Sequence, residues 1–89
     1  MNNYNIGDIV EIMYMAVSPY HYGEVVEIRQ SIHIARHSDL YQLRIKHFAP
    51  NDYIFTTLAL SDDIILIVSS DQANPNERGD IIRVLNQLR

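Results

Sequence analysis

Four histidines and one acidic pair are the residues whose types and spacing could support metal binding or acid–base chemistry. His33 and His37 have the i, i+4 spacing of a metal site, but this spacing brings two ligands together only on a helix. The β-branched residues around His33 indicate a strand instead, so we expect plain surface histidines and no metal site. Asp62 and Asp63 are adjacent in a predicted tight turn, where their side chains point apart, and we interpret them as solvated turn residues.

The chain carries no sequence motif of an enzyme active site. It contains no nucleophile elbow, phosphate-binding loop or dinucleotide fingerprint, and it has only three glycines from which a phosphate cradle could be built. No trio of nucleophile, base and oxyanion donor can be named. We therefore expect a binding module without a cofactor, and no catalysis by this chain alone.

Charge is distributed unevenly along the chain and marks one candidate binding surface. The net charge of −4 argues against general affinity for nucleic acid, yet residues 29–47 hold four basic residues and one acidic residue. A hairpin in this segment would present the following side chains on its polar face: Glu27, Arg29, Ser31, His33, Gln42, Arg44 and Lys46. We expect Arg29, His33, Arg44 and Lys46 to contact an acidic protein partner; an ordinary solvated hairpin face is the alternative.

A cluster of tyrosines forms the second candidate binding surface. Tyr20 and Tyr22 follow Pro19 in a predicted loop, and with Tyr53, at the start of a later strand, they could line an aromatic groove for a peptide. Alternatively, the tyrosine rings brace the loop against the fold while their hydroxyls stay in water. Barrels that bind single-stranded nucleic acid interleave aromatic and basic residues, and here the two groups are separate. This separation favours protein over nucleic acid as the partner.

Alternation of apolar and polar residues predicts the strands that position both surfaces. We expect strands at 9–15, 24–34, 41–46, 53–57 and 64–68, the last one buried on both sides. The pattern predicts a core formed by Val10, Ile12, Val26, Ile28, Leu43, Ile45, Leu66 and Val68. It predicts exposed side chains at Glu27, Arg29, Arg44 and Lys46.

The C-terminal segment predicts one amphipathic helix after a linker at 69–73. Asn74, Pro75 and Glu77 match the N-cap, first and third positions of a capping box. One side of the helix collects large aliphatic residues: Ile81, Ile82, Val84, Leu85 and Leu88. Because so short a helix is marginal alone, we expect an interface through Ile81, Ile82, Leu85 and Leu88. That interface forms either with the chain's own barrel or with a second copy, which would give a homodimer.

The order and punctuation of the strands resemble the SH3-like small β-barrel superfold. The resemblance is carried by Ile6-Gly7-Asp8-Ile9-Val10, by Tyr22-Gly23-Glu24-Val25-Val26, by Tyr41 to Ile45 and by Leu60 to Ile67. The two glycine-led openings are similar to barrels in the small stromal subunit of photosystem I and in the variable chain of ferredoxin–thioredoxin reductase. The resemblance implies a five-stranded barrel and no particular function. Polyproline specificity is not expected, since the chain has no tryptophan.

These patterns together predict one mostly-β domain, with an SH3-like barrel at 1–70 and a linker and amphipathic helix at 71–89. The lack of cysteine, of a signal-peptide pattern and of an apolar span long enough for a bilayer predicts a soluble, cytoplasmic protein without membrane contact. We expect a non-catalytic protein-binding adaptor or inhibitor of the kind that bacteria or phages encode. A nucleic-acid-associated regulator and a small accessory subunit of an enzyme complex are the alternatives.

Overall fold

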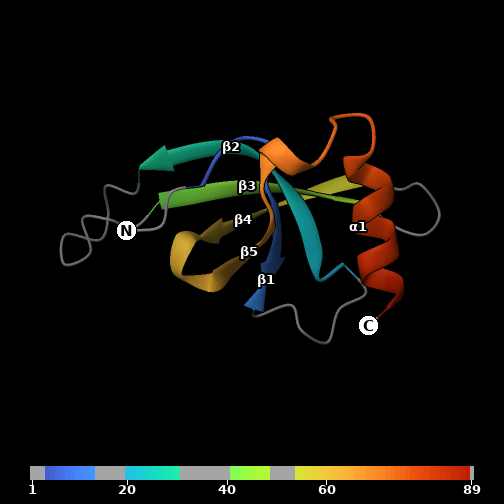
Figure 1. Cartoon of the computed structure of the whole chain (residues 1–89). Helices are drawn as coiled ribbons and strands as arrows, with labels where there is room; N and C mark the ends of the chain where they lie inside the picture. The colour runs from blue at the N-terminus through green and yellow to red at the C-terminus, as the bar shows by residue number, and fades with distance from the viewer. Residues whose placement is uncertain (1–3, 14–19, 31–40, 49–53, 89) are drawn as a thin grey trace.

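The computed structural model describes residues 4–13, 20–30, 41–48 and 54–88, and they form one antiparallel sheet with one α-helix (Figure 1). The strands are β1 (Ile9–Ile12), β2 (Tyr22–Gln30), β3 (Tyr41–Phe48), β4 (Ile54–Leu60) and β5 (Ile64–Val68). Short 3-10 turns η2 (Ser61–Asp63) and η3 (Ser70–Gln72) flank β5, and helix α1 (Arg78–Gln87) follows. The strand order is β4-β3-β2-β1-β5. The mostly-β prediction is confirmed, whereas the sheet is open, so closure into a barrel is not.

Strand β2 changes the phase of its alternation halfway along. Val25 pairs with Ile45 of β3, whereas Glu27 pairs with Arg44, so Val26 is an extra residue in the ladder. A bulge of this kind switches the set of alternate positions that faces the core. Val25 is therefore buried while Val26 is only half-buried, so the predicted burial of Val26 holds only in part.

One face of the sheet carries the larger of two hydrophobic clusters. Its buried members come from all five strands: Val10, Ile12, Val25, Leu43, Ile45, Ala59 and Ile64. Ile28 and Tyr4 pack against this cluster and stay partly exposed. The predicted burial of Val10, Ile12, Leu43 and Ile45 is confirmed, and that of Ile28 holds only in part.

Strand β5 differs most from its prediction. It lies at an edge of the sheet and pairs only with β1, so Ile65, Leu66 and Ile67 are exposed rather than buried on both sides. Val10 pairs with Leu66 and Ile9 with Val68, which leaves Ile67 as a second extra residue in a ladder. The predicted burial of Leu66 is wrong, and Val68 is half-buried.

Helix α1 covers the opposite face of the sheet at one end (Figure 1). Ile82 is buried there against Ile9 and Ala73. Partly buried side chains surround this second cluster: Tyr22, Phe48, Val68, Ile81 and Leu85. Because successive strand residues face opposite sides, β1 separates the two clusters. Of the two destinations expected for the helix, the structure shows packing on its own sheet, where it covers a face instead of closing a barrel end.

Helix α1 begins later than its local sequence signals suggest. Its first residue is Arg78, Glu77 precedes it with helical dihedral angles, and no side chain caps this end. Asn74 contributes its backbone carbonyl, which accepts a hydrogen bond from the Glu77 amide at 2.9 Å. The predicted side-chain capping box is therefore wrong, and tertiary contacts of Arg78 fix this end of the helix instead.

We call the contacts of Arg78 with Gly7, Glu24 and Ser70 the Arg78 clasp. Its guanidinium forms an ion pair with Glu24 at 3.5 Å and donates a hydrogen bond to the Ser70 carbonyl at 3.3 Å. Gly7 has φ +97°, a backbone conformation that favours glycine, and a Cβ there would lie 2.5 Å from an Arg78 nitrogen, so the guanidinium would have to shift. Buried Asp8 adds a second tie, since its carboxylate accepts the Ser70 amide at 2.7 Å.

Candidate partner-binding face

The basic residues predicted to bind a partner lie on one face of β2 and β3. Glu27 and Arg44 are opposite each other in the ladder, Arg29 lies two positions beyond Glu27, and Lys46 lies two positions beyond Arg44. Side chains two positions apart on a strand share a face. We call Glu27, Arg29, Arg44 and Lys46 the basic face. His33, also predicted to belong to it, lies outside the described residues.

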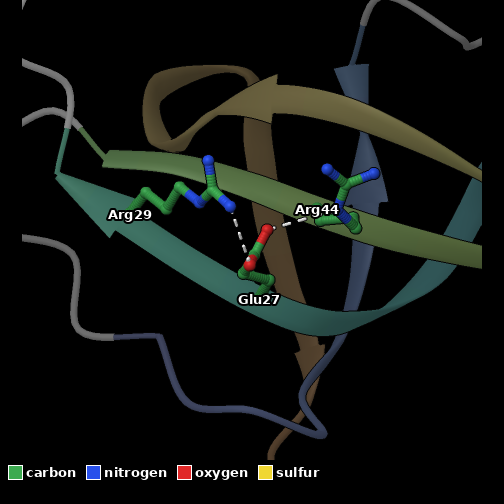
Figure 2. A network of polar contacts seen from close by, with 3 residues as sticks. All are labelled: Glu27, Arg29 and Arg44. Carbon is green, nitrogen blue, oxygen red and sulfur yellow. Dashed lines mark hydrogen bonds and ion pairs between the residues drawn. The ribbon is translucent and has the colours of Figure 1, made fainter.

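Glu27 holds the two arginines of the basic face (Figure 2). Its Oε1 accepts a hydrogen bond from Nε of Arg44 at 3.2 Å, and its Oε2 accepts one from a terminal nitrogen of Arg29 at 3.2 Å. The hydrogen bond from Arg44 is the largest cause that lowers the pKa of Glu27. Burial opposes it as the next largest, and the hydrogen bond from Arg29 and the charges of both arginines lower the pKa further. One carboxylate thus fixes guanidinium groups from two neighbouring strands.

The donors that Glu27 leaves unused face solvent. The side chains of Arg29 and Arg44 are 65% and 41% exposed. Glu27 uses only Nε of Arg44, and Figure 2 shows the terminal nitrogens of Arg44 directed away from Glu27. Among the described residues these terminal nitrogens have no hydrogen-bond partner. With Lys46, the face carries three cations against one carboxylate, and its arginines can still bind a planar anion.

An aromatic ring extends the basic face toward α1. The Lys46 ammonium lies 5.4 Å from the centre of the Phe48 ring, and the guanidinium of Arg83 on α1 lies 5.5 Å from it. Gly79 allows α1 to lie this close to the Phe48 ring, because a Cβ at Gly79 would lie 2.9 Å from a ring carbon of Phe48. Sequence reasoning missed Phe48 and Arg83. Phe48 lies two positions from Lys46, so the strand alternation could have placed it on the same face. No sequence pattern indicates that Arg83 of the helix contacts this strand.

The tyrosines predicted to form a groove lie in different surroundings. The Tyr20 ring packs edge-on against Phe55, with centroids 4.8 Å apart. Tyr22 packs in the cluster beneath α1, and its amide donates to Oδ1 of Asn86 at 3.0 Å. Tyr53 lies outside the described residues. The contacts of Tyr20 and Tyr22 are those of rings that brace the fold.

The helix residues predicted as an interface divide into two groups. Ile82 is buried in its own chain, with Ile81 and Leu85 packed beside it. Leu88, at the end of the helix, is exposed. The part of the interface that the structure shows is therefore intramolecular.

His47 comes from the positively charged segment but lies in the interior, away from the basic face. Its Nδ1 is 3.3 Å from the Tyr22 carbonyl and its Nε2 is 2.8 Å from Oγ1 of Thr57. Because a carbonyl only accepts, Nδ1 carries the proton and the Thr57 hydroxyl donates to Nε2. Burial lowers the pKa of His47, against smaller opposing effects of the hydrogen bonds with the carbonyls of Tyr22 and Tyr20. His47 is thus a buried residue of the interior and not part of the basic face.

The described residues contain no group of three metal-ligating side chains, and His33 and His37 lie outside them. No helix among them has the length and apolar character needed to cross a membrane. Comparison of the chain with protein-family models, curated proteins and solved structures found no match.

Proposed function

We propose that this chain is a small non-catalytic binding module, an adaptor or inhibitor, that binds an acidic protein surface through the basic face. The observation that carries this proposal is the arrangement around Glu27. Arg29 and Arg44 come from neighbouring strands, share one carboxylate and keep unused donors toward solvent. Side chains that are held before binding lose less conformational freedom when the partner arrives.

The chemistry of the basic face also favours one class of ligand. A guanidinium binds a carboxylate through two parallel hydrogen bonds, and the two terminal nitrogens of Arg44 are placed to do so. Glu27 lies between the arginines and repels a partner carboxylate directly above it. A protein surface with separate aspartates or glutamates meets this pattern, whereas the Phe48 ring, already in contact with two cations, is poorly placed to stack on a base.

We propose an SH3-like barrel as the framework of this module. The strand order β4-β3-β2-β1-β5 and the 3-10 turn between β4 and β5 both fit that architecture. In such a framework, the outer face of the central hairpin stays available to a partner while α1 covers only one end of it. The framework itself implies no ligand, so the function rests on the basic face.

A titration with two polyanions tests the proposal. The chain is titrated calorimetrically with a synthetic peptide of alternating glutamate and serine, and with an oligothymidylate of equal charge. The variant Arg29→Gln/Arg44→Gln/Lys46→Gln removes the cations. The control Gln72→Glu/Asn76→Asp/Gln87→Glu changes exposed positions and lowers the net charge by the same amount.

We expect the peptide to bind the unmodified chain and the control, more weakly as salt increases, and to lose about tenfold or more in affinity for the first variant. Equal losses in both variants would mean that only net charge matters. Tighter binding of oligothymidylate than of peptide would favour the nucleic-acid alternative. Unchanged affinity in the first variant, with loss in Tyr20→Ala, would move the site to the tyrosines.

A further inference from the structure

The outer edge of β5 is a second surface of distinct chemistry, separate from the basic face. Strand β5 ends the sheet, and its Ile65, Leu66 and Ile67 side chains are 45%, 43% and 39% exposed. The strand contains no charged residue. An exposed apolar edge strand offers both backbone hydrogen-bonding groups and side-chain contacts to an added strand.

The hydrogen bonds of β1 show which backbone groups of β5 point outward. The Ile12 amide donates to the His21 carbonyl at 2.9 Å, on the β2 side, so the backbone of Ile12 faces away from β5. Ile64 is the partner of Ile12, and Leu66 is the partner of Val10, two positions along. Antiparallel residue pairs alternate between hydrogen-bonded and non-hydrogen-bonded pairs, so the pairs of Ile12 with Ile64 and of Val10 with Leu66 are both non-hydrogen-bonded. Ile64 and Leu66 therefore both direct their amide and carbonyl groups away from β1.

The open part of this edge is short and has defined ends. At one end, the Tyr4 hydroxyl donates to the Ile64 carbonyl at 3.0 Å and so occupies the outward acceptor. At the other end, the extra residue Ile67 interrupts the regular ladder. Between them, the outward amide and carbonyl of Leu66 have no partner among the described residues. The edge therefore accommodates one short extended segment.

Acidic residues flank the edge and define the charge of its ligand. Asp62 and Asp63 precede β5, Asp71 follows it, and none of the three has an ion-pair partner among the described residues. Two copies paired antiparallel about Leu66 would bring the aspartates of one copy beside those of the other, and like charges across strands are destabilising. A segment with basic residues at both ends is attracted instead.

We propose that the β5 edge binds an extended segment of another protein, which adds to the sheet as a further strand. The segment has alternating apolar residues for Ile65, Leu66 and Ile67 to contact, and a lysine or arginine near each end. Its backbone pairs with the amide and carbonyl of Leu66. This inference is independent of the basic face, which lies on other strands.

The probe is the capped peptide Lys-Val-Thr-Val-Thr-Val-Lys, with two versions that are N-methylated at alternate residues. Binding is followed by the NMR shift of the Leu66 amide. We expect the parent peptide to shift this amide, and one methylated version to bind about tenfold or more weakly, because methylation removes the donors that face β5. No shift of the Leu66 amide, or equal binding of all three peptides, would overturn the proposal.

Two substitutions at one position give the matched test on the protein side. Leu66→Pro removes the outward amide but no hydrogen bond to β1, whereas Leu66→Ala keeps the amide and shortens the side chain. We expect Leu66→Pro to lose peptide binding and Leu66→Ala to retain most of it, both with folded spectra; if the proline variant does not fold, the methylated peptides decide.

Retained peptide binding in Arg29→Gln/Arg44→Gln/Lys46→Gln would separate this site from the basic face. A dimer of the unmodified chain in sedimentation that Leu66→Pro dissociates would assign the edge to a second copy and overturn the proposal.

Discussion

Two glutamates of strand β2 each pair with arginine, and their different burial gives the two ion-pair regions different roles. Glu24 meets Arg78 of α1 where both side chains are mostly buried, at 17% and 14% exposure. Glu27, three positions along the strand, meets Arg29 and Arg44 on the open face of the sheet.

The difference follows from solvation. A buried charge that loses its partner is left without water to replace it, so we expect the Arg78 clasp to contribute strongly to stability. Exposed ion pairs contribute little to stability because water and salt compete for them. The arginines held by Glu27 are therefore available to a partner without a large effect on folding.

Removal of the whole helix has the largest expected effect on the first region. Truncation after Ser70 deletes Arg78 and Ile82 together and exposes Ile9, and each buried aliphatic side chain contributes about 1.5–3 kcal/mol as an upper value. We expect the truncated chain to lose several kcal/mol of stability or fail to fold, as seen by circular dichroism during urea unfolding. An unchanged free energy of unfolding in urea would show that α1 is not part of the folding unit.

A single substitution in the Arg78 clasp has the next largest effect. Arg78→Met keeps the aliphatic stem but leaves the Glu24 carboxylate and the Ser70 carbonyl without their partner. We expect the free energy of unfolding to fall by about 3 kcal/mol. Arg29→Met is the control on the open face and should change stability little. Equal losses in the two variants would remove the distinction between the two regions.

The glycine beneath the Arg78 guanidinium provides a smaller, separable effect. Gly7→Ala places a Cβ at φ +97° and 2.5 Å from an Arg78 nitrogen, and we expect a loss of about 2 kcal/mol. In an Arg78→Met background the contact with the guanidinium is gone, so the same substitution should cost less. Urea unfolding of the four chains in this double-mutant cycle measures the difference. Strictly additive losses of stability for Gly7→Ala and Arg78→Met would contradict a contact between the two positions.

The free energy of unfolding should also decrease as pH is lowered, because of His47. Its pKa is lower in the folded chain than in the unfolded chain, so the unfolded state binds the proton first as pH decreases. The resulting loss of stability is absent above the unfolded pKa of about 6.5 and grows as pH falls from there toward the lowered folded pKa. The free energy of unfolding of the unmodified chain and of His47→Gln, measured across this range, should converge as pH falls. Parallel curves would show that His47 does not titrate differently on folding.

The sequence predicts the strands and the helix well because alternation and amphipathic spacing are local properties. It could not locate the bulge at Val26, since two consecutive valines fit either phase of the alternation. The apolar run at 64–68 likewise reads the same for a central strand and for an edge, and only the strand order separates them. The helix begins at Arg78 because contacts with Glu24 and Ser70 outweigh the local capping signal.

The candidate site was predictable in part for the same reason. The alternation places Arg29, Arg44 and Lys46 on one face of a hairpin. The role of Glu27 depends on the register between β2 and β3, which the bulge sets, and the sequence contains no local signal for it. Phe48 and Arg83 come together only because α1 folds back over β3.

The most direct test measures stability and binding together on one variant from each region. Arg29→Gln/Arg44→Gln/Lys46→Gln and Arg78→Met are compared for free energy of unfolding in urea and for affinity toward the glutamate–serine peptide, under conditions where both are folded. We expect the first variant to keep its stability and lose about tenfold or more in affinity, and the second to lose about 3 kcal/mol and keep its affinity. If stability and affinity fall together in both variants, the two regions are not distinct and the basic face is part of the framework rather than the binding site.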